Sequence, residues 1–267
     1  MIFLCCKLFG LVKEIMKKTA FITGATSGIG WATAEVFAEN GVRLILCGRR
    51  GERLKELAEK LSHQTEVTTL QFDVRDKESV AEKVGSLPNE WKQIDILINN
   101  AGNAHGLGDF NSADLEDFDA MIDINVKGLI YVSKAIIPQM VERQAGDIIN
   151  IGSVAGKEVY PNGSVYCASK FAVDAINQGM RKDLFTSGIR VSAIHPGLVE
   201  TEFSEVRFKG DSEKAEKVYQ GFEALQARDI AEIIWFAISR PKHVNIADLL
   251  VLPTAQASAT LVDRKGN

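Results

Sequence analysis

Cysteine and histidine are scarce in this sequence, and their placement argues against several kinds of site. The 267 residues include four cysteines and four histidines, and neither type shows the spacing of metal ligands. We therefore expect no bound metal. His195, next to Pro196 at the end of an expected strand, is interpreted as a packing residue because nothing else suggests a catalytic triad. The thiols suit the reducing cytoplasm, which is the expected location.

An excess of positive charge and a long hydrophobic run are also missing. The net charge is −4 and the isoelectric point is near 5.7, so we do not expect a nucleic-acid partner. The apolar run at residues 2–6 is interrupted by Lys7 and Lys13 before it reaches the length of a membrane span, and no cleavage site follows it. We expect no membrane partner and interpret residues 1–17 as an N-terminal extension, either non-native or disordered.

From residue 18 onward, short apolar runs alternate with longer amphipathic stretches, which is typical of repeated β-α-β units around a parallel sheet. The pattern predicts strands at 20–23, 43–47, 67–72, 94–98, 147–151, 189–194 and 247–252. It predicts helices at 31–40, 52–61, 77–87, 115–143 and 166–187, with a loop or kink near Pro138. The charged stretch 200–221 is interpreted as a helical excursion or a mobile flap over the substrate. We predict one α/β domain, residues 18–267, with about seven strands and helices on both faces.

A glycine-rich loop joins the first predicted strand to the helix that follows. Gly24 permits a tight turn, Gly28 lets the backbone approach a pyrophosphate, and Gly30 lets helix and strand pack closely. The helix N-terminus faces the negative charge of the phosphates. In isolation such a loop is also compatible with an ordinary strand-to-helix turn. The loop residues assigned to a dinucleotide cofactor are Gly24, Thr26, Ser27, Gly28, Ile29 and Gly30.

Two arginines follow the second predicted strand, where an NAD-dependent enzyme would place an acidic residue against the ribose hydroxyl. Arg49 and Arg50 can instead bind a 2′-phosphate through paired, charge-assisted hydrogen bonds. We therefore predict NADP (NADP+/NADPH) as the cofactor, with Arg49 as the first contact and Arg50 as the second. The alternative is that both side chains belong to a solvated basic turn.

Tyr166 and Lys170 lie four residues apart at the start of a predicted helix, so both side chains share one helix face. A nearby ammonium and an oxidised nicotinamide both favour the phenolate, which makes Tyr166 an acid/base candidate. Ser153, at the end of a predicted strand, can orient and polarise the reacting oxygen. Asn125 lies within a predicted helix. A buried amide at such a position either forms hydrogen bonds that cap or seal the surrounding structure or binds a water molecule. Such tyrosine and lysine pairs also occur by chance on many helices.

Taken together, these residues resemble the short-chain dehydrogenase/reductase family, because their order and spacing match throughout from residue 18 onward. The resemblance implies a Rossmann fold, with Ser153, Tyr166 and Lys170 catalytic and Asn125 completing a proton relay. It also implies a homotetramer. By the same analogy, further residues flank the adenine, line the cofactor or meet its nicotinamide end. These are Asp73, Val74, Asn100, Ala101, Gly102, Tyr166, Lys170, Pro196, Gly197, Val199 and Thr201.

The stretches 201–211 and 244–253 look like those of bacterial NADP-dependent serine/3-hydroxy acid dehydrogenases. That resemblance implies oxidation of L-serine, L-allo-threonine and related 3-hydroxy acids, or reduction of small 3-oxo acids. The segment Pro253 to Gln256 replaces the glycine-rich ending of many acyl carrier-protein reductases, which argues against such a substrate. A small carboxylate needs a cation, and Arg207 is the candidate, together with Ser153 on the reacting oxygen. Arg207 and Lys209 are alternatively solvated flap charges.

Two other functions remain open. One is a general NADPH-dependent carbonyl or aldehyde reductase, which uses the same residues on uncharged substrates. The other is an NADP-binding sensor without turnover, which would be expected to lose the tyrosine or the lysine. This chain keeps both Tyr166 and Lys170.

Overall fold

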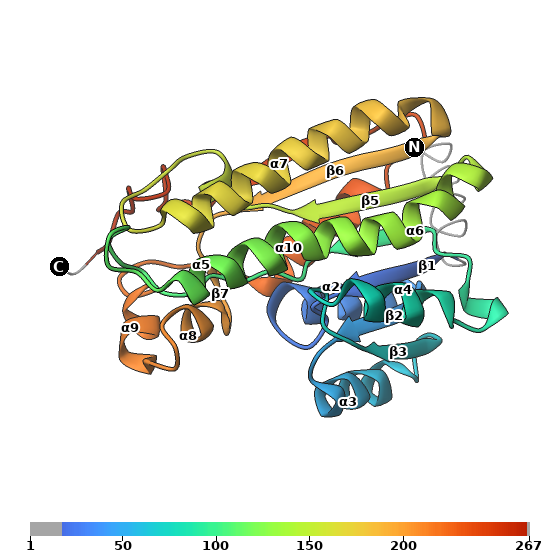
Figure 1. Ribbon diagram of the computed structural model, residues 1–267, viewed down its shortest axis with the longest axis horizontal. Helices are drawn as coiled ribbons and strands as arrows, with labels where there is room; N and C mark the ends of the chain where they lie inside the picture. Colours follow the sequence, from blue (N-terminus) through green and yellow to red (C-terminus); the bar gives the residue numbers. More distant parts are fainter. Residues whose placement is uncertain (1–17, 266–267) are drawn as a thin grey trace, which may run out of the picture.

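A computed structural model describes residues 18–265, so the expected N-terminal extension lies outside the described residues. The chain forms the parallel sheet of seven strands that the sequence predicts, and the strand order is β3-β2-β1-β4-β5-β6-β9 (Figure 1). The strands are β1 (Thr19–Thr23), β2 (Arg43–Gly48), β3 (Val67–Gln71), β4 (Ile96–Asn99), β5 (Gly146–Ile151), β6 (Ile189–Pro196) and β9 (Asp248–Val251). The strand order reverses between β1 and β4, where α/β proteins of this kind bind their ligands.

Helices cover both faces of this sheet because its strands are apolar on both sides. One face packs against α2 (Gly28–Glu39), α3 (Gly51–Leu61) and α10 (Ala227–Ile238). The other packs against α4 (Lys77–Gly85), α6 (Leu129–Arg143) and α7 (Ser164–Leu184). Phe37 and Leu57 are fully buried on the first side, as are Val132 and Ile136 on the second. The doubly wound, single-domain Rossmann arrangement predicted from the sequence is therefore confirmed.

The long predicted helix at 115–143 is interrupted, but not at its proline. It consists of α5 (Leu115–Ile122), a π-helical segment η2 (Asp123–Gly128) and α6, and Pro138 lies inside α6. A π segment inserts one extra residue per turn without ending the helix, so the hydrophobic pattern does not reveal it. The predicted kink near Pro138 is thus replaced by η2, which contains Asn125.

The stretch predicted as a flap is folded into short elements beyond the carboxyl end of β6. These are β7 (Val199–Glu200), α8 (Phe203–Arg207), α9 (Ser212–Lys217) and β8 (Leu225–Gln226), with β7 and β8 paired in a small second sheet. Figure 1 shows α8 and α9 standing apart from the main sheet, on the side toward which the strand arrows point. This placement sets α8 over the carboxyl edge of the sheet.

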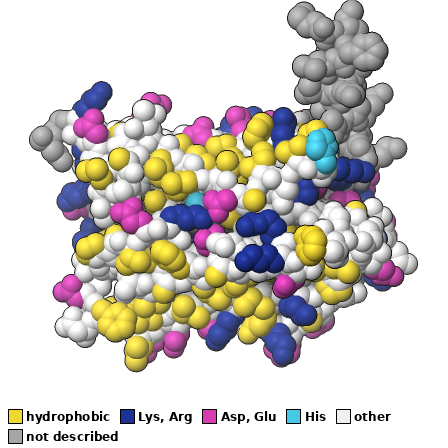
Figure 2. Space-filling model, turned by 90° about the horizontal axis from the view of Figure 1, so that it is seen from above, with side chains coloured by type: hydrophobic (Ala, Val, Ile, Leu, Met, Phe, Trp, Pro, Cys, Tyr) yellow, Lys and Arg dark blue, Asp and Glu magenta, His cyan; other side chains and the backbone are white. Residues whose placement is uncertain are grey.

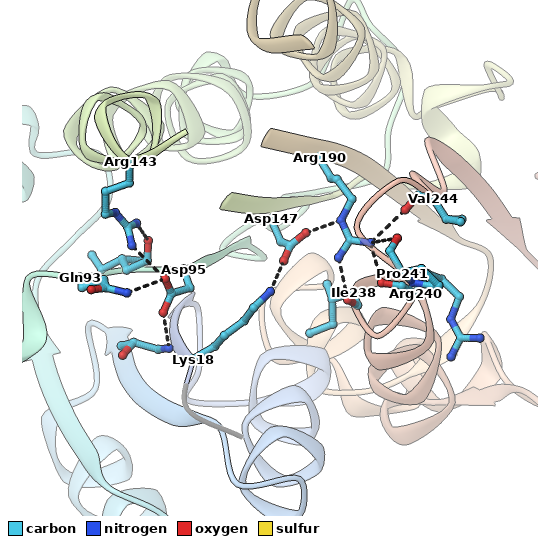
Figure 3. Close-up of polar contacts among 12 residues, drawn as sticks. Lys18, Gln93, Asp95, Arg143, Asp147, Arg190, Ile238, Arg240, Pro241 and Val244 are labelled. Atoms are coloured by element: carbon cyan, nitrogen blue, oxygen red, sulfur yellow. Dashed lines mark hydrogen bonds and ion pairs between the residues drawn. The ribbon is translucent and has the colours of Figure 1, made fainter. Parts of the chain in front are cut away.

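The opposite, amino-terminal edge of the sheet carries a network of ionic hydrogen bonds (Figure 3). Buried Asp147 accepts from Lys18 at 2.9 Å and from Arg190 at 2.6 Å. Arg190 also donates to the main-chain carbonyls of Ile238 and Val244, at 2.7 and 2.9 Å. These bonds join three strands to the end of α10, so the network closes this edge of the sheet.

The surface is mixed in character. Figure 2 shows hydrophobic side chains lying among charged ones on the face seen from above. Over the part of the chain that the structure covers, residues 18–265, none of the helices is both long enough and apolar enough to cross a membrane.

Candidate active site

A pocket of about 600 Å³ opens at the carboxyl edge of the sheet, beside the point where the strand order reverses. Every residue that the sequence analysis assigned to the cofactor lines it except Gly30, which lies behind the loop. Ser153, Tyr166, Lys170 and Arg207 also line it, whereas Asn125 does not. The structure therefore brings residues from widely separated segments to one cavity.

The glycine loop has the geometry that its sequence predicts. Gly24 and Gly28 have φ of +64° and +52°, a region that side chains other than glycine rarely adopt. A Cβ on Gly30 would lie 2.4 Å from the carbonyl oxygen of Gly24, so any side chain there would separate helix from strand. Asn100 holds the loop in place by donating to the carbonyls of Thr23 and Gly24 at 2.9 and 3.2 Å.

The two arginines after β2 differ in what holds them. Arg50 donates to Glu202 at 2.8 Å and to Thr26 at 3.0 and 3.1 Å, which ties the loop to the start of α8. Among the described residues, the Arg49 side chain forms one ion pair, a longer one of 3.8 Å with Asp73, and 58 % of that side chain is exposed. Burial opposes the ionisation of Asp73, but hydrogen bonds from Arg75 outweigh it and lower the pKa of Asp73. Arg49 is therefore the freer of the two cations.

Tyr166 is buried on the wall of the pocket, on the first turn of α7, and its ring lies 5.7 Å from that of Phe203. Burial raises the pKa of Tyr166, and a hydrogen bond with Ser153 opposes that shift only in part. The lowering expected from a neighbouring ammonium is not found among the described residues. The protein environment by itself therefore favours the protonated phenol, and stabilisation of the phenolate by oxidised nicotinamide stays a prediction.

Lys170 lies one turn further along α7 and is also buried. Its Nζ donates to the main-chain oxygen of Ile151 at 3.0 Å, at the end of β5. Burial lowers the pKa of Lys170 to about 8, because a desolvated ammonium is costly. An amine with this pKa can gain or lose a proton near physiological pH.

Asn125 lies close to Tyr166 and Lys170, but its side chain is hydrogen-bonded to other groups of the protein. Its amide donates to the Asn103 carbonyl at 2.8 Å and to the Ser169 hydroxyl at 2.9 Å, and its oxygen accepts from the Asn103 amide at 2.8 Å. The side chain therefore seals the junction between η2, the loop after β4 and α7. Both protons of the amide are used, so a relay at this position would have to employ the main chain of Asn125.

Arg207, at the end of α8, points back over the catalytic side of the pocket. It donates to the Tyr160 hydroxyl at 3.0 Å, and its guanidinium carbon lies 5.6 Å from the centre of the Tyr166 ring. Its Nε is buried and has no hydrogen-bond partner within residues 18–265. Arg207 is thus a half-buried cation with an unused donor beside Tyr166. A solvated charge on a flap would not have these properties.

Several residues of the site were missed by the sequence analysis. Tyr160 and Phe203 line the pocket beside Tyr166, and Glu202 binds both Arg50 and Arg53. An aromatic residue six positions before Tyr166 was a weak available signal for Tyr160. No local pattern marks Glu202, because its partners lie about 150 residues earlier in the chain.

Comparison with known proteins agrees with this geometry. The family model described as short chain dehydrogenase matches residues 18–212. The NADP-dependent 3-hydroxy acid dehydrogenase YdfG of Salmonella typhi is 48 % identical over 241 residues, which cover 90 % of this chain and 96 % of that protein. Sulfoacetaldehyde reductase 2 of Chromohalobacter salexigens is 45 % identical, covering 93 % of this chain and all of that protein.

Among solved structures, the closed form of serine dehydrogenase complexed with NADP+ superposes with a TM-score of 0.87. It is 45 % identical in sequence, and the match covers 92 % of this chain and 99 % of that one. The family match spans well over half of the chain, and the relatives match nearly their whole length. This chain therefore belongs to the short-chain dehydrogenase family.

Proposed function

We propose that this protein is an NADP-dependent oxidoreductase that oxidises the β-hydroxyl of small 3-hydroxy acids, such as L-serine, L-allo-threonine or 3-hydroxypropionate, or reduces the matching 3-oxo acids. One observation favours a substrate with a carboxylate group. The Arg207 guanidinium lies 5.6 Å from the Tyr166 ring and has an unused buried donor. A carboxylate bound there would hold its β-carbon close to the phenol.

The pocket suits NADP. Exposed Arg49 can pair with a 2′-phosphate, while Arg50 is bound by Glu202 and holds the loop. The glycines at positive φ in the loop and the N-terminus of α2 suit a pyrophosphate. The bound nicotinamide would supply the carbon that gives or takes the hydride. We assign the remaining cofactor contacts to Asp73, Val74, Asn100, Ala101, Gly102, Pro196, Gly197, Val199 and Thr201.

Tyr166 is proposed as the acid/base group and Ser153 as the group that orients the reacting oxygen. Because Tyr166 holds its proton at neutral pH, it is ready to protonate a carbonyl oxygen during reduction. Oxidation needs the phenolate, which the positive charge of oxidised nicotinamide would stabilise, and a neutral Lys170 that can accept the proton. Lys170 then exchanges the proton near its pKa of about 8. We therefore expect kcat/KM for oxidation to rise as the pH increases through 8, and that for reduction to show no such rise.

The experiment follows NADPH absorbance after L-serine or 3-hydroxypropionate is added with NADP+. We expect turnover in the native protein and a loss of about 10³-fold in Tyr166→Phe, because general acid/base catalysis contributes rate factors of this order. Tyr131→Phe, which removes a hydroxyl outside the pocket, is the matched control and should keep full activity.

Other outcomes would identify another function. Oxidation of NADPH by uncharged aldehydes, with no hydroxy acid accepted, would favour the general carbonyl reductase. Tight NADP binding without turnover of any substrate would favour the sensor. Reduction of sulfoacetaldehyde is a second candidate, because a relative of that name is 45 % identical and a sulfonate is also an anion that Arg207 could bind.

We further propose a homotetramer in the cytoplasm. Exposed Leu115, Phe171 and Phe185 lie on or next to α5 and α7 and support an association surface there. Sedimentation of the native protein would test the tetramer, and a monomeric species at micromolar concentration would contradict it.

A further inference from the structure

Near the carboxyl end of β6, three side chains from distant segments converge. His195 lies on β6, Asp174 on α7 and Asp248 at the start of β9, and one ligand atom from each lies within 4.8 Å of the others. His195 Nε2 is 3.4 Å from Asp248 Oδ2 and 3.7 Å from Asp174 Oδ1. None of the three lines the pocket, so the cluster is separate from the proposed active site.

The histidine in this cluster is fully buried, and its polar neighbours among the described residues are the two carboxylates and the main chain of Ser153. His195 is 0 % exposed, and within the described part of the chain neither of its ring nitrogens has a hydrogen-bond partner. Asp174 Oδ1 is likewise buried and unpartnered there. Leaving such atoms unsatisfied costs about 1 to 3 kcal/mol each, so their convergence on one point requires an explanation.

The spacing of these atoms matches a small coordination sphere. Ligand atoms about 2.1 Å from a zinc ion at tetrahedral angles lie about 3.4 Å apart. The two separations from His195 Nε2, 3.4 and 3.7 Å, are close to that value. Burial lowers the pKa of His195, which keeps the imidazole in the neutral form that binds metals.

The ammonium of Lys157 already lies beside the two carboxylates of the cluster. Lys157 Nζ lies 2.7 Å from Asp248 and 3.1 Å from Asp174, and 29 % of its side chain is exposed. With a neutral histidine, two carboxylates and one ammonium leave a net charge of −1. A divalent ion in place of the ammonium would bring the charge to zero, and Lys157 is exposed enough to turn outward into water.

We propose that His195, Asp174 and Asp248 form a binding site for a divalent transition metal ion of the zinc type, in competition with the ammonium of Lys157. A bound ion would join α7, β6 and β9. Asp174 is one turn beyond Lys170 on α7, and a Cβ on Gly152, next to Ser153, would lie 2.3 Å from the His195 ring. The site would therefore brace the elements that carry the catalytic side chains, without contributing to the chemistry.

Calorimetric titration with zinc chloride near neutral pH tests this site. The full-length protein is used without a histidine tag, and Cys5→Ser and Cys6→Ser remove thiols that would also bind zinc. We expect one ion per chain and an upward shift of Tm with zinc. Lys157→Met should bind at least about tenfold more tightly, because the competing cation is gone. Lys182→Met, which removes an exposed lysine on α7, should bind as the parent does.

The cluster is then broken by Asp248→Asn in the Lys157→Met background, which should abolish binding. Asp183→Asn, an exposed aspartate on α7, is its matched control and should leave binding intact. Lys157→Gln replaces Lys157→Met if the methionine variant is not folded by circular dichroism. Absence of binding in the Lys157 variant, or binding that survives Asp248→Asn, would overturn the proposal.

Discussion

At the amino-terminal edge of the sheet, buried Asp147 accepts from two cations, and half-buried Arg190 also donates to main-chain carbonyls (Figure 3). At the carboxyl edge of the same sheet, buried polar atoms are left without partners. Within residues 18–265 the unpartnered buried side-chain atoms belong to Asn99, Asn103, Asp174, His195 and Arg207, all in the carboxyl edge region or in elements packed against it.

The difference separates stability from function. A fully paired buried network stabilises the fold only if it stays complete, since removing one member leaves an uncompensated charge. Unpaired groups and a buried ammonium cost stability and persist where a ligand or a proton uses them. The amino-terminal edge therefore holds the sheet together, and the carboxyl edge keeps groups ready for chemistry.

The largest effect on stability is expected at the amino-terminal edge. Asp147→Ala would leave Lys18 and Arg190 without their shared carboxylate, and we expect the free energy of unfolding to fall by about 3 to 5 kcal/mol. Urea denaturation measures this change. Asp183→Ala, at an exposed position, should cost less than about 0.5 kcal/mol. Equal losses in both variants would contradict the role given to the network.

At the carboxyl edge, the next effect should appear in cofactor choice. Arg49→Ala should raise the KM for NADP by about 100-fold, since a charge-assisted hydrogen bond contributes about 1.5 to 3 kcal/mol, and leave the KM for NAD unchanged. Arg50→Ala should instead lower Tm, because Arg50 is bound to Glu202. If Arg50→Ala had the greater effect on NADP, the assignment of the two arginines would be reversed.

A smaller effect is expected from the cation on α8. Arg207→Met should raise the KM for L-serine by about tenfold while kcat changes less, because the contact would be made in both ground and transition states. Lys209→Met removes a flap charge that is paired with Asp114 and Asp117, and should leave the KM as it was. An unchanged KM in Arg207→Met would remove Arg207 from the substrate site.

The fold was predictable from the sequence because its signals are local. The apolar strands, the amphipathic helices and the glycine loop each lie within one short segment, and their order determines a parallel sheet. The spacing of Tyr166 and Lys170 is equally local. The π segment at Asp123–Gly128 could not be found in this way, because one extra residue in a turn leaves the hydrophobic pattern nearly unchanged.

Residues of the active site were predictable from the sequence only where they belong to a recognisable motif. Ser153, Tyr166 and Lys170 are brought to one pocket as expected, but the raised pKa of Tyr166 depends on burial, which residue types do not reveal. The pairing of Arg207 with Tyr160 joins positions 47 residues apart. Similarly, the sequence does not reveal the two carboxylate neighbours of His195, because they come from other elements of the fold.

One measurement compares stability with function at a single residue. Lys170→Met replaces the buried ammonium with an uncharged side chain of similar size. We expect the variant to be inactive yet more stable than the native protein by about 1 to 3 kcal/mol near neutral pH. The native pKa is lowered from 10.5 to about 8, so the folded chain binds fewer protons between these values and native stability rises with pH across them. The advantage of the variant should therefore be present below pH 8 and disappear by pH 10.5. An inactive variant that is less stable than the native protein near neutral pH would contradict the account.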